Sequence, residues 1–277
     1  MNAPLPLVSV CIPTYRGAAH ISAAIESVLA QSLTDFELLI IDDNSPDDTA
    51  VRVASHSDPR IRFLKNPSNL GPQGNWNRCL SVSRGKYFKL LPQDDLLTPS
   101  CLEKQVAILE QDTEHRLALV FCARTIVNAN GRVIMKRGYP GKLTGPIPAQ
   151  SVINRCLRRG TNLLGEPGSV LIRKELADQI GEFDADCPYV IDLDYWFRLL
   201  LKGDAYYLPE PLASFRVSGG SWSIAIGSKQ REDFRRFIAK VAANRDFKAR
   251  SVDIHMGKLM ADLNNYLRII FYRLALK

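Results

Sequence analysis

Five short apolar runs alternate with helical patterns through the first 125 residues, and this alternation restricts the fold more than any other feature of the chain. Between the runs, apolar residues recur at helical spacing, as Ile21, Ile25 and Val28 do. Continuous apolar strands joined by helices are typical of a mainly parallel sheet covered on both faces. We therefore predict an α/β fold with strands at 6–13, 36–42, 60–65, 86–91 and 117–122.

Polar residues gather where three of these predicted strands end. Residues 14–16 (Thr-Tyr-Arg), 42–44 (Asp-Asp-Asn) and 93–95 (Gln-Asp-Asp) follow the first, second and fourth strands. Ligands of parallel α/β sheets bind beyond the carboxyl ends of the strands, so we expect these clusters to converge on one nucleotide-binding crevice. The chain contains neither GxGxxG nor GxxxxGK[ST], which argues against a dinucleotide fold and against a P-loop.

The adjacent carboxylates Asp94 and Asp95 need an explanation because like charges repel each other. One explanation is a solvated surface turn. The other is a nucleoside diphosphate site, in which a divalent cation lies between these carboxylates and the phosphate oxygens, the ligands that Mg²⁺ and Mn²⁺ prefer. Asp42 and Asp43 are suited to accept hydrogen bonds from a ribose or a base, whereas a helix cap explains Asp47.

The pattern after residue 125 is less regular. Asn130 and Gly131 predict the turn of a hairpin. Asp192 and Asp194 lie in the first turn of a predicted helix, where they could stabilise the helix dipole or provide a general base. Thr98 and Pro99 are predicted to begin a helix as its N-cap and first residue. Other predicted elements are a helix at 148–159, a turn leading into a strand at 165–175, and helix from 228 to the end.

Composition indicates a globular protein that is not secreted. Of the 277 residues, 46% are hydrophobic and 23% charged, and no apolar stretch reaches eighteen residues. The N-terminus lacks the features of a signal peptide, so we expect a cytoplasmic location. The six cysteines form no CxxC motif and are predicted to be buried thiols, without disulfides or zinc. From residue 227 onward the chain has twelve Lys and Arg and five Asp and Glu, a surplus of +7 that equals its whole net charge. Such a basic segment could bind anionic lipid or nucleic acid, or have no partner.

Three segments resemble the inverting family 2 glycosyltransferases, which have the GT-A fold. They read VSVCIPTYRGAAHISAAIESVLAQSLTDFELLIIDDNSPDDT, NLGPQGNWNRCLSVSRGKYFKLLPQDDLLTP, and GEPGSVLIRKELADQIGEFD followed by VIDLDYWFRL. The resemblance covers roughly residues 7–217. It implies a Rossmann-like, mainly parallel sheet flanked by helices. The implied catalytic domain is 1–226, with a nucleotide-binding part to about 125 and an acceptor-binding part from about 126, before a basic helical extension at 227–277.

The resemblance also implies the roles of individual residues. Asp192 matches the catalytic base, Asp95 the ligand of Mn²⁺ or Mg²⁺, and Glu166 faces the acceptor. The donor would be a nucleotide sugar, with a UDP-sugar favoured, and the acceptor a glycan or a lipid-linked glycan of a bacterial cell surface, handled at the inner face of the cytoplasmic membrane. No nucleic acid is implied. The residues matched to nucleotide-sugar binding are Pro13, Thr14, Tyr15, Asp43, Asn77 and Asp94.

Three departures from the family pattern leave other functions open. Pro92 replaces the first acid of the fuller DxDD cluster, Arg16 replaces an asparagine, and Ser218 stands where many members have a histidine. A sugar nucleotidyltransferase and a non-catalytic nucleotide-sugar binding module are therefore alternatives.

The C-terminal segment predicts an amphipathic helix with an apolar face. That face would pack on the catalytic domain, form a homodimer, or lie on an anionic membrane. Its predicted members are Leu259, Leu263, Tyr266, Leu267, Ile270 and Leu274.

Overall fold

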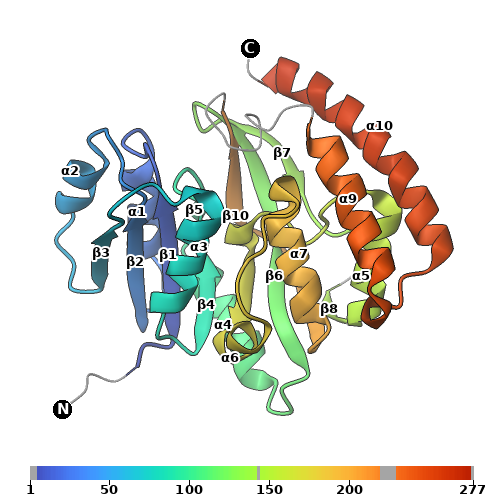
Figure 1. Ribbon diagram of the computed structural model, residues 1–277. Helices are drawn as coiled ribbons and strands as arrows, with labels where there is room; N and C mark the ends of the chain where they lie inside the picture. Colours follow the sequence, from blue (N-terminus) through green and yellow to red (C-terminus); the bar gives the residue numbers. More distant parts are fainter. Residues whose placement is uncertain (1–4, 142–143, 219–228, 276–277) are drawn as a thin grey trace.

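A single ten-stranded sheet with helices on both sides forms the centre of the molecule (Figure 1). The computed structural model describes residues 5–141, 144–218 and 229–275. The strand order is β3-β2-β1-β4-β9-β6-β10-β5, with β7 paired to β6 and β8 paired to β10. The strands are β1 (Val8–Thr14), β2 (Phe36–Asp42), β3 (Ile61–Lys65), β4 (Tyr87–Leu90), β5 (Leu96–Leu97), β6 (Leu117–Asn128), β7 (Val133–Arg137), β8 (Gly145–Ile147), β9 (Val170–Arg173) and β10 (Asp204–Val217).

The first four strands form the predicted parallel sheet. β1 pairs with β2 and β4, and β2 pairs with β3, all in parallel. The register places Thr14 beside Asp42, so the polar residues after β1 and β2 share one edge. Helices on this half are α1 (Ile21–Leu29), α2 (Thr49–Ala54), α3 (Gly71–Val82) and α4 (Cys101–Gln111).

One predicted helix start is wrong by two residues. α4 begins at Cys101 with Ser100 as its N-cap, because Thr98 and Pro99 form a turn in which the Cys101 amide donates to the Thr98 carbonyl.

The second half of the sheet is mixed. β9 lies between β4 and β6 and runs antiparallel to both, whereas β6 and β10 run parallel. The sequence pattern did not predict β10, because Pro209 and Pro211 interrupt its apolar alternation. The pairing of β10 with β6 shifts register between Leu208 and Pro211, as expected where prolines remove ladder donors. The predicted hairpin at 127–134 is confirmed as the connection of β6 with β7.

The remaining helices cover the second half of the sheet and include the predicted C-terminal helices. The aromatic rings of Phe237 and Phe247 lie 5.1 and 6.0 Å from that of Phe197, so the C-terminal helices share one core with the rest of the chain. The boundary predicted near residue 226 lies outside the described residues. The elements are α5 (Ala149–Arg159), η1 (Pro167–Ser169), α6 (Lys174–Ile180), η2 (Pro188–Val190), α7 (Ile191–Leu200), α9 (Lys229–Ala243), η3 (Arg245–Phe247) and α10 (Ser251–Ala275).

Close backbone contact fixes α10 against α5. A Cβ added to Gly257 would lie 2.3 Å from the Leu157 carbonyl oxygen, and one added to Gly160 would lie 2.6 Å from the Ala261 amide. Gly160 also ends α5 in the left-handed conformation, with φ of 58°. The crossing therefore requires both glycines.

All six cysteines are buried and free, as predicted. Across the described helices, none combines the length and apolar content needed to span a bilayer.

Candidate active site

Gln93 fixes the segment that follows β1. Its Oε1 accepts hydrogen bonds from the Tyr15 amide at 2.9 Å and from the Thr14 hydroxyl, while its Nε2 donates to the Tyr15 carbonyl at 3.1 Å. A Cβ on Gly17 would lie 2.3 Å from the Thr14 Oγ1, so glycine is needed there. Thr14 is buried, Pro13 half-buried and Tyr15 exposed. The sequence placed Gln93 in the right cluster but gave no sign that it joins two loops.

Backbone strain occurs just after β1 and just after β2. Arg16 has a φ of 53° and Asn44 a φ of 59°, in the left-handed region that side chains disfavour. Non-glycine residues in this region cluster at binding and catalytic sites. The two outliers flank the edge at which the nucleotide-binding residues were predicted.

Asp43 holds the loop that leads into α3. Its Oδ1 accepts from the Asn66 Nδ2 at 2.7 Å and from the Leu70 amide at 2.8 Å, and its Oδ2 accepts from the Gly71 amide at 2.9 Å. An ionised carboxylate has about four acceptor positions, so these bonds leave about one for a ligand. Asp43 is therefore both a support of the pocket wall and a candidate contact for a base or ribose.

Asn77 does not join this group. Its side chain bonds the backbone of Phe183, accepting from the amide at 2.8 Å and donating to the carbonyl at 3.2 Å. Asn75, two residues earlier and so about 200° around the helix, instead donates to the Ile41 carbonyl at 3.0 Å. Asn77 thus links α3 to the segment before η2, and its role in nucleotide binding stays a prediction.

Asp95 has one buried carboxylate oxygen without a hydrogen bond. Its Oδ1 accepts from the Arg216 amide at 2.9 Å, and its Oδ2 has no hydrogen-bond partner. Burial, and then the charge of Asp94, raise the pKa of Asp95 well above its usual value. Arg216 also donates from Nε to the Asp94 carbonyl at 3.0 Å, which fixes the acid pair. Because β10 was not predicted, the sequence did not reveal this role of Arg216.

The residues present fit a cation that is completed by its ligand. Within the described ranges, no three His, Cys, Asp or Glu side chains form a metal cluster by themselves. An unpartnered buried carboxylate oxygen beside a second carboxylate nevertheless suits one inner ligand of Mn²⁺ or Mg²⁺. A cation held in this way would take further ligands from diphosphate oxygens and water.

Asp192 is a half-buried carboxylate with a pKa near neutrality. Its Oδ1 accepts from the Leu193 amide at 2.7 Å and its Oδ2 from the Asn162 Nδ2 at 2.9 Å. Burial raises its pKa to about 7, and the negative charge of Glu166 acts in the same direction. This residue therefore combines a fixed orientation with the pKa of an effective general base.

Glu166 connects the two acidic positions. It forms an ion pair with Arg124, with 2.5 Å between the Arg124 Nε and its Oε2, and Arg124 is almost fully buried. The charge of Glu166 raises the pKa of both Asp95 and Asp192. The structure therefore brings three of the predicted site residues close enough for their charges to interact, from the turn between β4 and β5, from the loop before η1 and from the first turn of α7. Arg124 and Asn162 were not predicted from the sequence.

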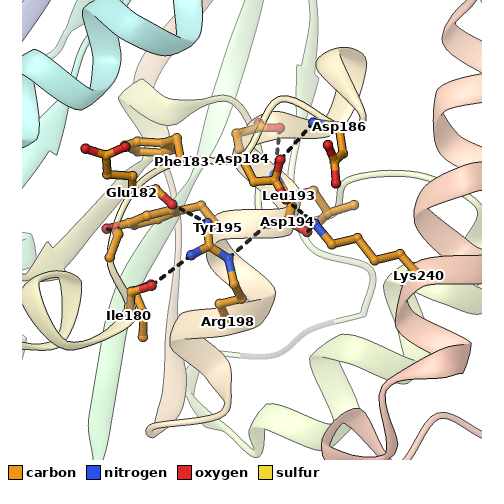
Figure 2. A network of polar contacts seen from close by, with 12 residues as sticks. Ile180, Glu182, Phe183, Asp184, Asp186, Leu193, Asp194, Tyr195, Arg198 and Lys240 are labelled. Carbon is orange, nitrogen blue, oxygen red and sulfur yellow. Dashed lines mark hydrogen bonds and ion pairs between the residues drawn. The ribbon is translucent and has the colours of Figure 1, made fainter.

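Asp194 faces away from this cluster, as expected for its position on the helix. Its Oδ2 accepts from the Arg198 Nε at 3.0 Å, and its Oδ1 lies 2.8 Å from the Lys240 Nζ (Figure 2). Lys240 also pairs with Asp184 at 2.6 Å. Arg198 donates further to the Ile180 carbonyl, so Asp194 joins α7 to α6 and α9. Asp194 therefore stabilises the packing of α7 against α6 and α9.

Comparison with known proteins places the chain in a family. A family model described as "Glycosyl transferase family 2" matches residues 9–181. The chain belongs to this family. An uncharacterized protein of Mycobacterium tuberculosis is 30% identical to this family 2 chain over 241 residues, which are 83% of the chain and 73% of that protein. An uncharacterized glycosyltransferase of Rickettsia typhi is 29% identical over 78% of the chain and 65% of its own length.

A further relative has a described activity. It is the Escherichia coli protein WfgD, named "UDP-Glc:alpha-D-GlcNAc-diphosphoundecaprenol beta-1,3-glucosyltransferase", which is 33% identical over 138 residues, covering 50% of the chain and 53% of WfgD.

Solved glycosyltransferases share the GT-A fold of this family 2 chain. Residues 1–349 of Staphylococcus aureus TarS, in complex with UDP-GlcNAc, match with a TM-score of 0.67 and 20% identity, over 94% of the chain and 72% of that structure. The Pyrobaculum calidifontis mannosyltransferase PcManGT, in complex with GDP-Man and Mn²⁺, matches with a TM-score of 0.67 and 17% identity, over 98% of the chain and 74% of that structure. The fold predicted from the sequence is thus confirmed.

Proposed function

We propose that this chain transfers a sugar, with inversion, from a nucleoside diphosphate sugar to a hydroxyl group of a glycan or lipid-linked acceptor in bacterial cell-surface polysaccharide synthesis. The observation that carries the proposal is Asp192, an oriented carboxylate with a pKa of about 7 beside Glu166. A base poised near neutral pH at the acceptor side is what such a displacement requires.

The nucleotide would bind at the edge formed by the ends of β1, β2 and β4. Thr14 and Tyr15, fixed by Gln93, would contact the nucleoside, and Asp43 has about one acceptor position left for it. Asp94 would contact the ribose. Pro13 and Asn77 complete the proposed set on the strength of the family resemblance.

Asp95 would hold a Mn²⁺ or Mg²⁺ ion through its unpartnered Oδ2. Bound there, the cation would offset the charge that develops on the departing diphosphate. The Mn²⁺ in PcManGT supports this assignment.

Asp192 would take the proton of the acceptor hydroxyl. As that proton moves to the carboxylate, the hydroxyl oxygen bonds to the anomeric carbon and the bond from this carbon to the diphosphate oxygen breaks. One displacement at the anomeric carbon inverts its configuration. Glu166, held by its ion pair with the buried Arg124, would orient the acceptor.

The names of similar proteins support a nucleotide-sugar donor but leave several bases open. TarS was solved with UDP-GlcNAc and PcManGT with GDP-Man. WfgD is named for transfer from UDP-Glc to a lipid diphosphate acceptor, and its similarity is the main support for a UDP-sugar and a cell-surface pathway. We favour a UDP-sugar donor on this basis.

A calorimetric titration with UDP and GDP, with Mn²⁺ and with EDTA, tests the donor site. We expect tight binding that needs Mn²⁺ in the wild type and loss of that dependence in Asp95→Ala. The same affinity with Mn²⁺ and with EDTA would remove the metal from the mechanism. Incubation with nucleotide sugars and acceptors then distinguishes the candidate functions: binding without turnover indicates a binding module, and formation of a nucleotide sugar from NTP and sugar phosphate indicates a nucleotidyltransferase.

The exposed face of α10 supports a peripheral contact with the cytoplasmic face of a membrane. The predicted apolar face does not pack on the catalytic part, because α10 contacts α5 through its other side at Gly257 and Ala261. Leu274 belongs to the predicted face, but its side chain lies outside the described residues. The exposed apolar side chains of α10, 39% to 64% accessible, are Val252, Met256, Leu259, Leu263, Tyr266, Leu267, Ile269 and Ile270.

Liposome flotation tests this contact against a homodimer. We expect Leu259→Ser/Leu263→Ser to lower flotation with anionic vesicles, because each buried apolar side chain contributes to interfacial binding. Light scattering of the wild-type chain provides the comparison: a dimer that the same substitutions dissociate, together with unchanged flotation, would assign the face to self-association.

A further inference from the structure

Arg137 stands on the acceptor side of the site without a recorded partner. The register pairs it directly with Arg124 across β6 and β7, so the two side chains project from the same face of the sheet. Arg124 is neutralised by Glu166. Within the described residues, the structure records no hydrogen bond or ion pair for the guanidinium of Arg137.

The surroundings of Arg137 carry surplus positive charge. Its side chain keeps exposed surface, and desolvation by the neighbouring protein atoms lowers its pKa. The positive charges of Arg124 and Arg268 lower the pKa further, while Glu166 and Tyr189 oppose this. Arg124, Arg137 and Arg268 therefore lie close enough for their charges to interact. Glu166, a predicted acceptor-side carboxylate, is near the same group.

Arg268 reaches this space from the C-terminal extension. Its guanidinium lies 4.8 Å from the ring centroid of Tyr189, in the turn that precedes Asp192, and its Nη1 donates to the Gln230 Oε1 at 2.6 Å. An arginine has five N–H donors, and the structure records one bond for these. The aromatic stack thus fixes the plane of the guanidinium and leaves donors for a ligand.

The position of Arg268 is set by firm contacts of α10. The Asn264 Nδ2 donates to the Arg159 and Gly160 carbonyls at 2.7 and 3.0 Å, and buried Asp253 pairs with Arg158 at 2.6 Å. Figure 1 shows α10 on the same side of the molecule as α5 and α9, the two helices that it contacts. The extension therefore holds Arg268 beside Tyr189, in the turn that precedes Asp192.

We propose that Arg137 and Arg268 together bind a phosphate or diphosphate group of the acceptor. Guanidinium groups match phosphate oxygens with paired hydrogen bonds, and two of them that share Tyr189 as a neighbour suit a group with more than one negative charge. The proposal rests on the proposed function at Asp192. It names the chemistry of the acceptor, which a phosphate-bearing lipid or a phosphate-bearing soluble glycan would share.

Calorimetry with the full chain in EDTA tests the pair without the divalent cation of the donor site. The probes are inorganic pyrophosphate and geranyl diphosphate, with geraniol as the uncharged control. We expect both anions to bind, and Arg137→Gln and Arg268→Gln each to weaken binding ~10–100-fold, the range for hydrogen bonds between charged groups. Tighter binding of geranyl diphosphate would indicate a lipid-linked acceptor, and equal binding a soluble one.

Lys258→Gln removes the same charge from the same helix and should leave both affinities unchanged. Arg268→Lys keeps the charge but loses the planar fork, so it should retain only part of the affinity. No binding of either anion by the wild type, or equal loss in Lys258→Gln, would overturn the proposal. Titration of UDP with Mn²⁺ separates the two proposals: unchanged UDP binding in Arg137→Gln confines the defect to the acceptor, whereas no UDP binding in the wild type contradicts the proposed function itself.

Discussion

Replacing Asp192 with asparagine should reduce catalysis and increase stability at the same time. The substitution keeps the shape of the side chain but removes the proton acceptor. General-base catalysis commonly contributes about 10²–10⁴-fold, so we expect transfer to fall by this factor while donor affinity stays unchanged. In the wild type, kcat/KM should fall about tenfold per pH unit below the Asp192 pKa of about 7 and level off above that pH.

The gain in stability follows from the cost of ionising a buried carboxylate. The rise of the Asp192 pKa from 3.8 to about 7 corresponds to roughly 4 kcal/mol against the ionised form. Because the side chain keeps some contact with solvent, and because the asparagine NH₂ cannot accept the hydrogen bond that Asn162 donates to Asp192, we expect a smaller net gain of about 2 kcal/mol. The folded state binds the proton more tightly than the unfolded state does, so wild-type stability falls as the pH rises from about 4 to 7.

Denaturation as a function of pH, combined with transfer assays, measures both effects. The advantage of Asp192→Asn should be absent near pH 4, grow with pH and be complete above about pH 7. Asp194→Asn is the matched control, since it changes the same residue type two positions along the same helix. A transfer rate of Asp192→Asn equal to wild type, or equal unfolding free energies at about pH 8, would refute the reasoning.

Three further predictions concern the support of the site. Asp194→Ala removes the partner that Lys240 and Arg198 share, so it should lower the free energy of unfolding by about 1–3 kcal/mol in chemical denaturation while donor affinity stays unchanged; a loss of affinity at unchanged stability would contradict this. Gly257→Val forces a side chain against the backbone of α5, so we expect the free energy of unfolding to fall by about 1–3 kcal/mol. A calorimetric melting temperature equal to that of the wild type would contradict this. Asp43→Asn weakens three hydrogen bonds to the loop before α3, so amide exchange at residues 66–71 should accelerate, and protection equal to wild type would show that Asp43 does not hold this loop.

The sequence by itself determined the parallel half of the fold and the edge at which the site lies. Strands β1, β2 and β4 are short, apolar and buried, and β3 at the sheet edge keeps the apolar residues Ile61, Phe63 and Leu64, so the local pattern was sufficient to find them. The polar residues that follow them are forced to one edge by the parallel register, which pairs Thr14 with Asp42. The position of Asp192 relative to the other acids came from the family resemblance, because nothing local to that helix fixes it.

Only the tertiary structure decided which side chains act together. Arg216 reaches Asp95 across 121 positions of sequence, and Arg124 reaches Glu166 across 42. β10, which provides Arg216, has two prolines and no regular alternation, so its strand character depends on pairing with β6. Arg268 likewise reaches the ring of Tyr189 because glycine contacts seat α10 on α5. Such contacts are set by the packing of distant elements, whereas periodicity reports only on residues that are neighbours along the chain.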